Sequence, residues 1–188
     1  MEKIIMGQQY TEIPDQLKQF IENQKIFFVG TATAESRVNI SPKGMDSLRV
    51  LDNKRVVWLN VTGSGNETSA HVQESPRMTI MFAAFDGPPM ILRLYGVANV
   101  IHKNDAEWNE LSSLFGPTPG ARQIFDLTVD LIQTSCGMAV PFYDYVDERN
   151  LLTDWAVKKG DDGIKEYWLQ NNQLSLDGKP TNIADKNT

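Results

Sequence analysis

The sequence contains a single cysteine, Cys136, and only two histidines among its 188 residues. One cysteine cannot form an internal disulfide, which fits a protein of a reducing compartment. The two histidines, His71 and His102, stand apart from any cysteine with zinc-ligand spacing. We therefore expect a cytoplasmic protein without a metal site.

Long apolar runs and an excess of positive charge are also missing. No stretch approaches the roughly 20 apolar residues that a membrane-crossing helix needs, and the first six residues lack the apolar core of a signal peptide. The 18 Lys and Arg residues are outnumbered by 24 Asp and Glu, which gives a formal net charge of −6. Such a chain lacks long-range attraction to nucleic-acid phosphates. We expect neither a membrane nor a nucleic acid as partner, although one local cationic pocket for a phosphate remains compatible with this charge.

The composition that is present is that of a globular protein, with 41% hydrophobic and 22% charged residues. No repeat, low-complexity tract or long linker divides the chain. We therefore expect a single domain over residues 1–188, with a helical C-terminal extension from about residue 147. A first helix is predicted near Pro14, because neighbouring apolar residues have the spacing of one helix face. These residues are Ile13, Leu17, Phe20 and Ile21.

Short β-rich segments make up most of the remaining chain. They are predicted at residues 26–33, 38–41, 49–51, 56–61, 78–85, 90–102 and 125–131. Polar, turn-prone residues separate them, and these connections are too short for parallel crossovers. Because closure removes exposed strand edges, many short antiparallel strands favour a barrel. The pattern predicts a mainly β fold, a small antiparallel barrel with peripheral helices, one of them over about residues 105–114.

Two segments have the pattern of a phosphate site. The first ends a predicted strand with Ser41, a rigid proline and Lys43, and the second leads through Gly63-Ser64-Gly65 into a helix that opens at Asn66 or Thr68. A helix N-terminus presents unpaired backbone N–H groups, and glycines let a ligand approach the backbone closely. The lysine would supply the compensating charge. An ordinary loop, a helix cap and a solvated lysine would give the same pattern, so the residues alone leave both interpretations open.

The order of the segments adds a resemblance to a known family. It depends on Ser-Pro-Lys-Gly at residues 41–44, Ser75-Pro76-Arg77-Met78 before a strand, and the hydrophobic-Arg-hydrophobic-x-Gly-x-Ala pattern from Leu92 to Ala98. The chain resembles the pyridoxamine 5′-phosphate oxidase-like family from about residue 25 to about residue 181. This resemblance implies a six-stranded antiparallel split β-barrel with peripheral helices, FMN as the cofactor, and a homodimer whose sites are built from two chains.

The resemblance also implies which residues bind FMN. The family holds the FMN phosphate with a cation after the second strand and with donors at the helix opening after the third. The implied cofactor-binding residues are Ser41, Lys43, Asn60, Asn66, Thr68, Ser69 and Arg93. The vitamin oxidases of the family have Ser-Arg-Lys at the helix opening, whereas this chain has Asn66-Glu67-Thr68, so Lys43 is the one strong positive charge placed at the phosphate. Arg93 points away from the leucines beside it, either towards the flavin or outward into solvent.

The function implied is that of an FMN-dependent oxidoreductase acting on an unidentified small molecule, with NAD(P)H as the expected reductant. The flavin carries the hydride chemistry, so no catalytic residue is assigned. Two alternatives stay open: a flavin-binding or stress protein without turnover, and a relative that uses F420 or haem. An acidic chain suits the acidic tail of F420 poorly, and neither histidine is placed to bind haem. We expect His71 to have a packing role and His102, at a strand end, to be exposed.

Overall fold

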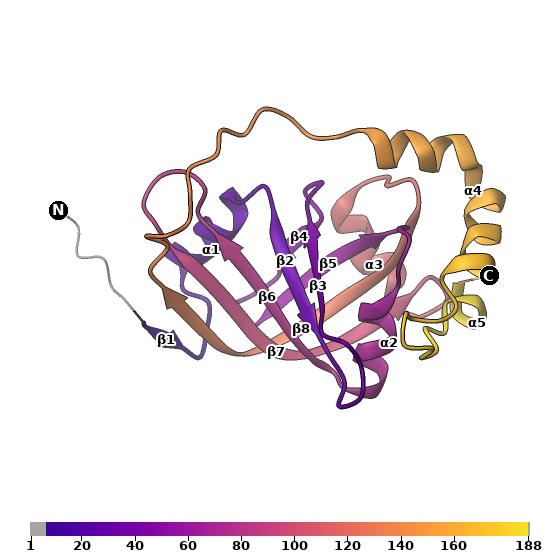
Figure 1. Cartoon of the computed structure of the whole chain (residues 1–188), viewed down its shortest axis with the longest axis horizontal. Coiled ribbons are helices and arrows are strands. Elements are labelled where there is room, and N and C mark those ends of the chain that lie inside the picture. The colour runs from indigo at the N-terminus through magenta and orange to yellow at the C-terminus, as the bar shows by residue number, and fades with distance from the viewer. Residues whose placement is uncertain (1–6, 188) are drawn as a thin grey trace.

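The computed structural model describes residues 7–187, and its strands form one antiparallel sheet (Figure 1). The strands are β1 (Gln9–Tyr10), β2 (Phe27–Thr31), β3 (Asn39–Lys43), β4 (Leu48–Val50), β5 (Arg55–Val61), β6 (Arg77–Ala83), β7 (Ile91–His102) and β8 (Ala121–Ser135). Their order is β3-β2-β6-β7-β8-β5-β4, and β1 pairs with β8. The sheet curls but stays open between β3 and β4, which confirms the antiparallel split barrel. It has eight strands rather than six, and the two shortest, β1 and β4, make up the difference.

Helices lie around this sheet. They are α1 (Asp15–Asn23), α2 (Glu67–Glu74), α3 (Trp108–Ser112), α4 (Leu151–Asn171) and α5 (Ile183–Asn187), with one 3-10 turn at Ser113–Phe115. The helix predicted over residues 105–114 is therefore shorter and ends in that turn. Among residues 7–187, no helix is both long and apolar enough to cross a membrane.

The main core fills the concave side of the curled sheet. Its aromatic centre is Trp58, which is fully buried and stacks on Phe125 with ring centroids 4.6 Å apart. The predicted apolar face of α1 is confirmed, because Leu17 and Ile21 are buried in this same cluster. Burial of such side chains is the main source of stability in a fold of this kind.

Strand β8 begins four residues earlier than its predicted range. Its first part holds Arg122 and Gln123, which are polar yet buried. A hydrophobicity pattern cannot find such a strand start, because it takes polar residues for exposed ones. Further along, the pairing of β7 with β8 shifts register between Tyr95 and Gly96, where the backbones approach closely.

The C-terminal helices pack against the end of the sheet that carries α2. In Figure 1 the segment between β8 and α4 arches over one end of the sheet, and the chain then returns beside α2. The fully buried Trp168 of α4 donates a hydrogen bond from Nε1 to Thr62 Oγ1 over 2.8 Å. This bond fixes α4 to the loop that follows β5, so the C-terminal segment helps to shape that loop.

Candidate functional site

The edge strand β3 presents three polar side chains on one face. Asn39, Ser41 and Lys43 alternate with exposed residues, as the period of a strand requires. The Ser41 hydroxyl donates to Asn39 Oδ1 over 3.2 Å, and Asn39 Nδ2 donates to Thr68 Oγ1 over 3.1 Å. Through Asn39, the structure thus connects the predicted Ser41 to the predicted Thr68 of α2. Asn39 was not predicted as a site residue. Its position two residues before Ser41 places both side chains on the same face of a strand, and the sequence could have indicated it in this way.

Lys43 lies at the wall of a cavity of about 200 Å³ that Asn60 and Gly63 also line. Its Nζ lies 5.2 Å from the centroid of the Trp58 ring and forms no ion pair or hydrogen bond with any described residue. Burial, and after it the charge of Arg122, lower the pKa of Lys43 to about 8, with Glu67 acting in the opposite direction. An ammonium group without an anionic partner therefore faces this cavity.

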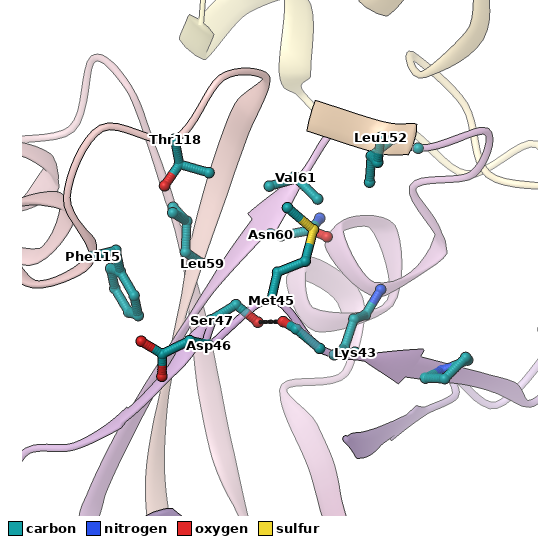
Figure 2. Close-up of a pocket in the computed structure, with 13 residues that line it drawn as sticks. Lys43, Met45, Asp46, Ser47, Leu59, Asn60, Val61, Phe115, Thr118 and Leu152 are labelled. Carbon is teal, nitrogen blue, oxygen red and sulfur yellow. Dashed lines mark hydrogen bonds between the residues drawn. The ribbon is translucent and has the colours of Figure 1, made fainter. Parts of the chain in front are cut away.

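The rest of the cavity wall is mostly apolar. Figure 2 shows Lys43, Met45 and Asn60 around the same space, with Phe115 and Leu152 on its far sides. These residues come from four separate parts of the chain, namely the end of β3 with the connection that follows it, β5, the turn after α3, and α4. A cation at one side of an apolar cleft suits a ligand that combines a ring with an anionic group.

The rim of the cavity between β3 and β4 has an unusual backbone. Met45 and Asp46 have φ angles of 62° and 50°, which non-glycine residues adopt infrequently. The carboxylate of Asp46 accepts two hydrogen bonds of 2.9 Å from Arg49, and Ser47 Oγ donates to the Gly44 carbonyl (Figure 2). These bonds hold the connection between the two strands in one conformation beside Lys43.

The start of α2 holds the other predicted residues. Asn66 is the residue before the helix, its Nδ2 donates to the Asn172 carbonyl over 3.3 Å, and its buried Oδ1 has no partner among the described residues. The Ser69 hydroxyl is fully buried and donates to the Thr181 carbonyl over 2.9 Å. The side chain of Ser69 therefore fixes the C-terminal segment to α2.

Glu67, the acidic residue at the helix opening, is turned towards the C-terminal segment. Its Oε1 accepts a hydrogen bond of 3.2 Å from the backbone N–H of Leu176. Its carboxylate also lies against Gly65, where a Cβ would come within 2.3 Å of Oε2. The glycine thus makes room for the carboxylate.

Arg122 adds a second buried cation that the sequence did not place at the phosphate loop. It is 3% exposed, it donates to Asn172 Oδ1 over 2.8 Å and to the Gly65 carbonyl over 3.1 Å, and its Nε has no partner among the described residues. Burial lowers its pKa to about 10, which still leaves it charged at neutral pH, and nearby Glu67 and Tyr167 act in the opposite direction. The sequence could not indicate this contact, because 57 residues separate Arg122 from Gly65 along the chain.

Arg93 lies elsewhere. It points to the face of β7 opposite the buried Leu92 and Leu94, as predicted, and donates to Ser135 Oγ over 3.0 Å. It lines a separate hollow on the outer face of the sheet, together with exposed Val38 and Ile40 of β3. Within one chain, the structure does not bring Arg93 to the cavity of Lys43.

Both histidines are buried. The expectation that His102 is exposed is wrong, because α5 covers this end of β7 and Asn187 accepts a hydrogen bond from the Lys103 backbone. Burial lowers the pKa of His102 to about 4, so it is neutral at pH 7. His71 lies with Nδ1 3.1 Å from Thr31 Oγ1 in the packing of α2 against β2. In residues 7–187, no group of three or more His, Cys, Asp or Glu side chains is arranged to hold a metal ion.

Comparison with known proteins supports the resemblance noted in the sequence. Residues 13–136 match the sequence profile of the family described as Pyridoxamine 5′-phosphate oxidase. The Pyridoxamine 5′-phosphate oxidase family protein ustO of Aspergillus flavus is 33% identical over 191 residues, which cover 91% of this chain and 76% of that protein.

Two solved structures share the fold. HupZ of Group A Streptococcus has a TM-score of 0.54 at 20% identity, over 65% of this chain and 98% of its own. A provisionally described pyridoxamine 5′-phosphate oxidase of Lactobacillus delbrueckii has a TM-score of 0.54 at 17% identity, over 68% of this chain and 98% of its own. At these identities the likeness extends to the fold alone.

Proposed function

Since the chain belongs to the pyridoxamine 5′-phosphate oxidase family, we propose that it binds FMN without a covalent bond and works as an FMN-dependent oxidoreductase on a small molecule. One observation carries this proposal. The unpartnered ammonium of Lys43 faces the same cavity as Gly63, the first residue of the loop that leads into α2. A cation beside a glycine loop and a helix N-terminus is an arrangement that holds a phosphate.

The residues around this cavity fit FMN in two further respects. Arg122 is a second buried cation, and no carboxylate lies within ion-pair distance of it in the described part of the chain. The apolar wall from Met45 to Leu152 suits a flat aromatic ring. The cavity of about 200 Å³ is smaller than the roughly 300–1,000 Å³ of most ligand pockets, which favours a site completed by another chain.

When bound, FMN supplies hydride transfer at its N5 atom. The protein's own contribution is to hold and orient the cofactor. Lys43 and the backbone N–H groups of the loop would bind the phosphate, and Asn60 lies on β5 where it can meet the polar part of the ligand. Apolar side chains on the cavity wall would keep water from the ring. NAD(P)H is the reductant we propose.

Identification of the bound cofactor tests the proposal. An acid extract of the protein, purified from a flavin-replete host and resolved by chromatography, is expected to contain FMN. Anaerobic addition of NADH or NADPH is then expected to bleach the flavin absorbance. Recovery of FAD, F420 or haem would contradict the cofactor assignment. Bound FMN that neither nicotinamide reduces would identify a flavin-binding protein without this turnover.

We also propose that the chain works as a two-fold symmetric homodimer. The outer face of the sheet carries exposed Val38 and Ile40 beside the hollow of Arg93, and the segment after β8 exposes Phe142 and Tyr143. A second copy covering these apolar side chains could bring its Arg93 towards the cofactor. Light scattering at micromolar concentration is expected to give twice the mass of one chain. A monomer with FMN fully bound would contradict a site built from two chains.

A further inference from the structure

The loop of residues 63–65 is held from behind by two side chains that come from distant parts of the chain. Asn172, at the end of α4, donates from Nδ2 to the carbonyls of Gly63 and Ser64 over 3.1 and 3.3 Å. Arg122 donates to the carbonyl of Gly65 over 3.1 Å and to Asn172 Oδ1 over 2.8 Å. All three consecutive carbonyls of the loop therefore point to the same pair of side chains.

This arrangement fixes where the N–H groups of the loop point. In a planar trans peptide the N–H group lies opposite to the C=O group. The N–H groups of Ser64, Gly65 and Asn66 therefore point away from Arg122 and Asn172. None of the three donates a hydrogen bond to another described group. Since the preceding residue, Gly63, lines the cavity of Lys43, these N–H groups form a row of free donors beside that cavity, at the entry to α2. Successive free backbone N–H groups can bind an anion such as a phosphate.

Arg122 also places a positive charge behind this row of donors, on the carbonyl side of the loop. Its side chain is almost wholly buried, its Nε has no partner, and no described carboxylate lies within 4.0 Å of it. A buried cation without a counter-ion is costly unless an anion compensates for it. The carboxylate of Glu67 acts on Arg122 from beyond ion-pair distance, and its effect on the pKa of Arg122 is smaller than the opposing effect of burial. A phosphate on the open side of the loop would provide the missing negative charge across a low-dielectric interior.

We propose that Arg122 and Asn172 are positioning residues that make the site specific for a phosphorylated flavin. They act through the loop: they hold its carbonyls back, present its N–H groups to the phosphate, and place a buried charge behind them. The cation that this chain lacks at the helix opening, where Asn66-Glu67-Thr68 stands, comes instead from β8. This inference rests on the proposed function, because it assumes that the anion is the FMN phosphate.

FMN and riboflavin differ only in the phosphate, so the ratio of their affinities isolates its recognition. Titration of the flavin-free full chain, followed by flavin fluorescence, is expected to show the parent preferring FMN. Arg122→Met is expected to lower FMN affinity by at least about 10-fold and to leave riboflavin affinity almost unchanged. Arg122→Lys is expected to retain part of the preference, because it keeps the charge but loses the fork of donors.

Two further variants separate recognition from folding. Lys103→Met removes another cation of the C-terminal packing, one that lies over the Trp168 ring, and should leave the FMN-to-riboflavin ratio unchanged. Asn172→Asp keeps the shape, pairs the charge of Arg122 and removes the donor to the Gly63 and Ser64 carbonyls, and should lower the ratio. An unchanged ratio in Arg122→Met, or in both Arg122→Lys and Asn172→Asp if the methionine variant does not fold, would overturn this inference and leave the proposed function standing. A parent protein without preference for FMN would instead overturn the phosphate site itself.

Discussion

Lys43→Ala is expected to weaken FMN binding by about 1.5–3 kcal/mol, the range for a hydrogen bond to a charged group. The reason is that Lys43 faces the cavity and forms no ion pair with any described residue, so a bound phosphate would be its ion-pair partner. FMN binding should also raise the lowered pKa of Lys43, since an anion favours the charged form. Calorimetric titration of the flavin-free protein measures the change.

A matched lysine controls for the loss of a surface charge. Lys25 lies 5.7 Å from the centroid of the Tyr145 ring, a contact like that of Lys43 with Trp58, but it lies outside the cavity. Lys25→Ala should therefore bind FMN as the parent does, and Lys43→Arg should retain part of the affinity. If Lys43→Ala binds FMN as tightly as Lys25→Ala, the lysine has no role at the phosphate.

Gly96→Ala is expected to destabilise the fold by about 3 kcal/mol or more. At the register shift between β7 and β8, a Cβ on Gly96 would lie 2.0 Å from the Thr128 carbonyl oxygen, and both atoms belong to rigid parts of the sheet. The strands would have to separate at the longest pairing of the barrel. Urea unfolding followed by tryptophan fluorescence gives the difference in the free energy of unfolding.

Gly30 provides the control for this change. It lies within β2, and a Cβ there would have its nearest neighbours at 3.8 Å, an ordinary contact. Gly30→Ala should therefore change the free energy of unfolding by less than about 1 kcal/mol. Equal stability of the two variants would contradict the close approach of β7 and β8 at Gly96.

Much of the fold could be predicted from the sequence because apolar side chains alternate where strands have one buried face. The helical spacing of apolar residues likewise predicted the face of α1 that holds Leu17 and Ile21. Periodicity could not predict the first residues of β8 or the burial of His102, because polar residues there are covered by parts of the chain 50 or more residues away. The periodicity of apolar residues carries information only about residues that are close together along the chain.

The residues of the candidate site likewise divide into those that the sequence could indicate and those that depend on contacts between distant parts of the chain. Local patterns pointed to Lys43 and the opening of α2, and the family resemblance added Asn60. The structure brings these residues to one cavity and its adjoining loop. The roles of Arg122 and Asn172 depend on contacts across 50 and more than 100 residues, so no local motif contains them. The place of Arg93 relative to the cofactor depends on a second chain, and it stays a prediction.

A crystal structure of the protein with FMN tests the central claim most directly. The phosphate is expected within hydrogen-bond distance of Lys43 Nζ and of the backbone N–H groups of residues 64–66, with Arg122 still bound to the Gly65 carbonyl behind the loop. A phosphate bound away from Lys43 and this loop, or a flavin that occupies another part of the barrel, would contradict the account.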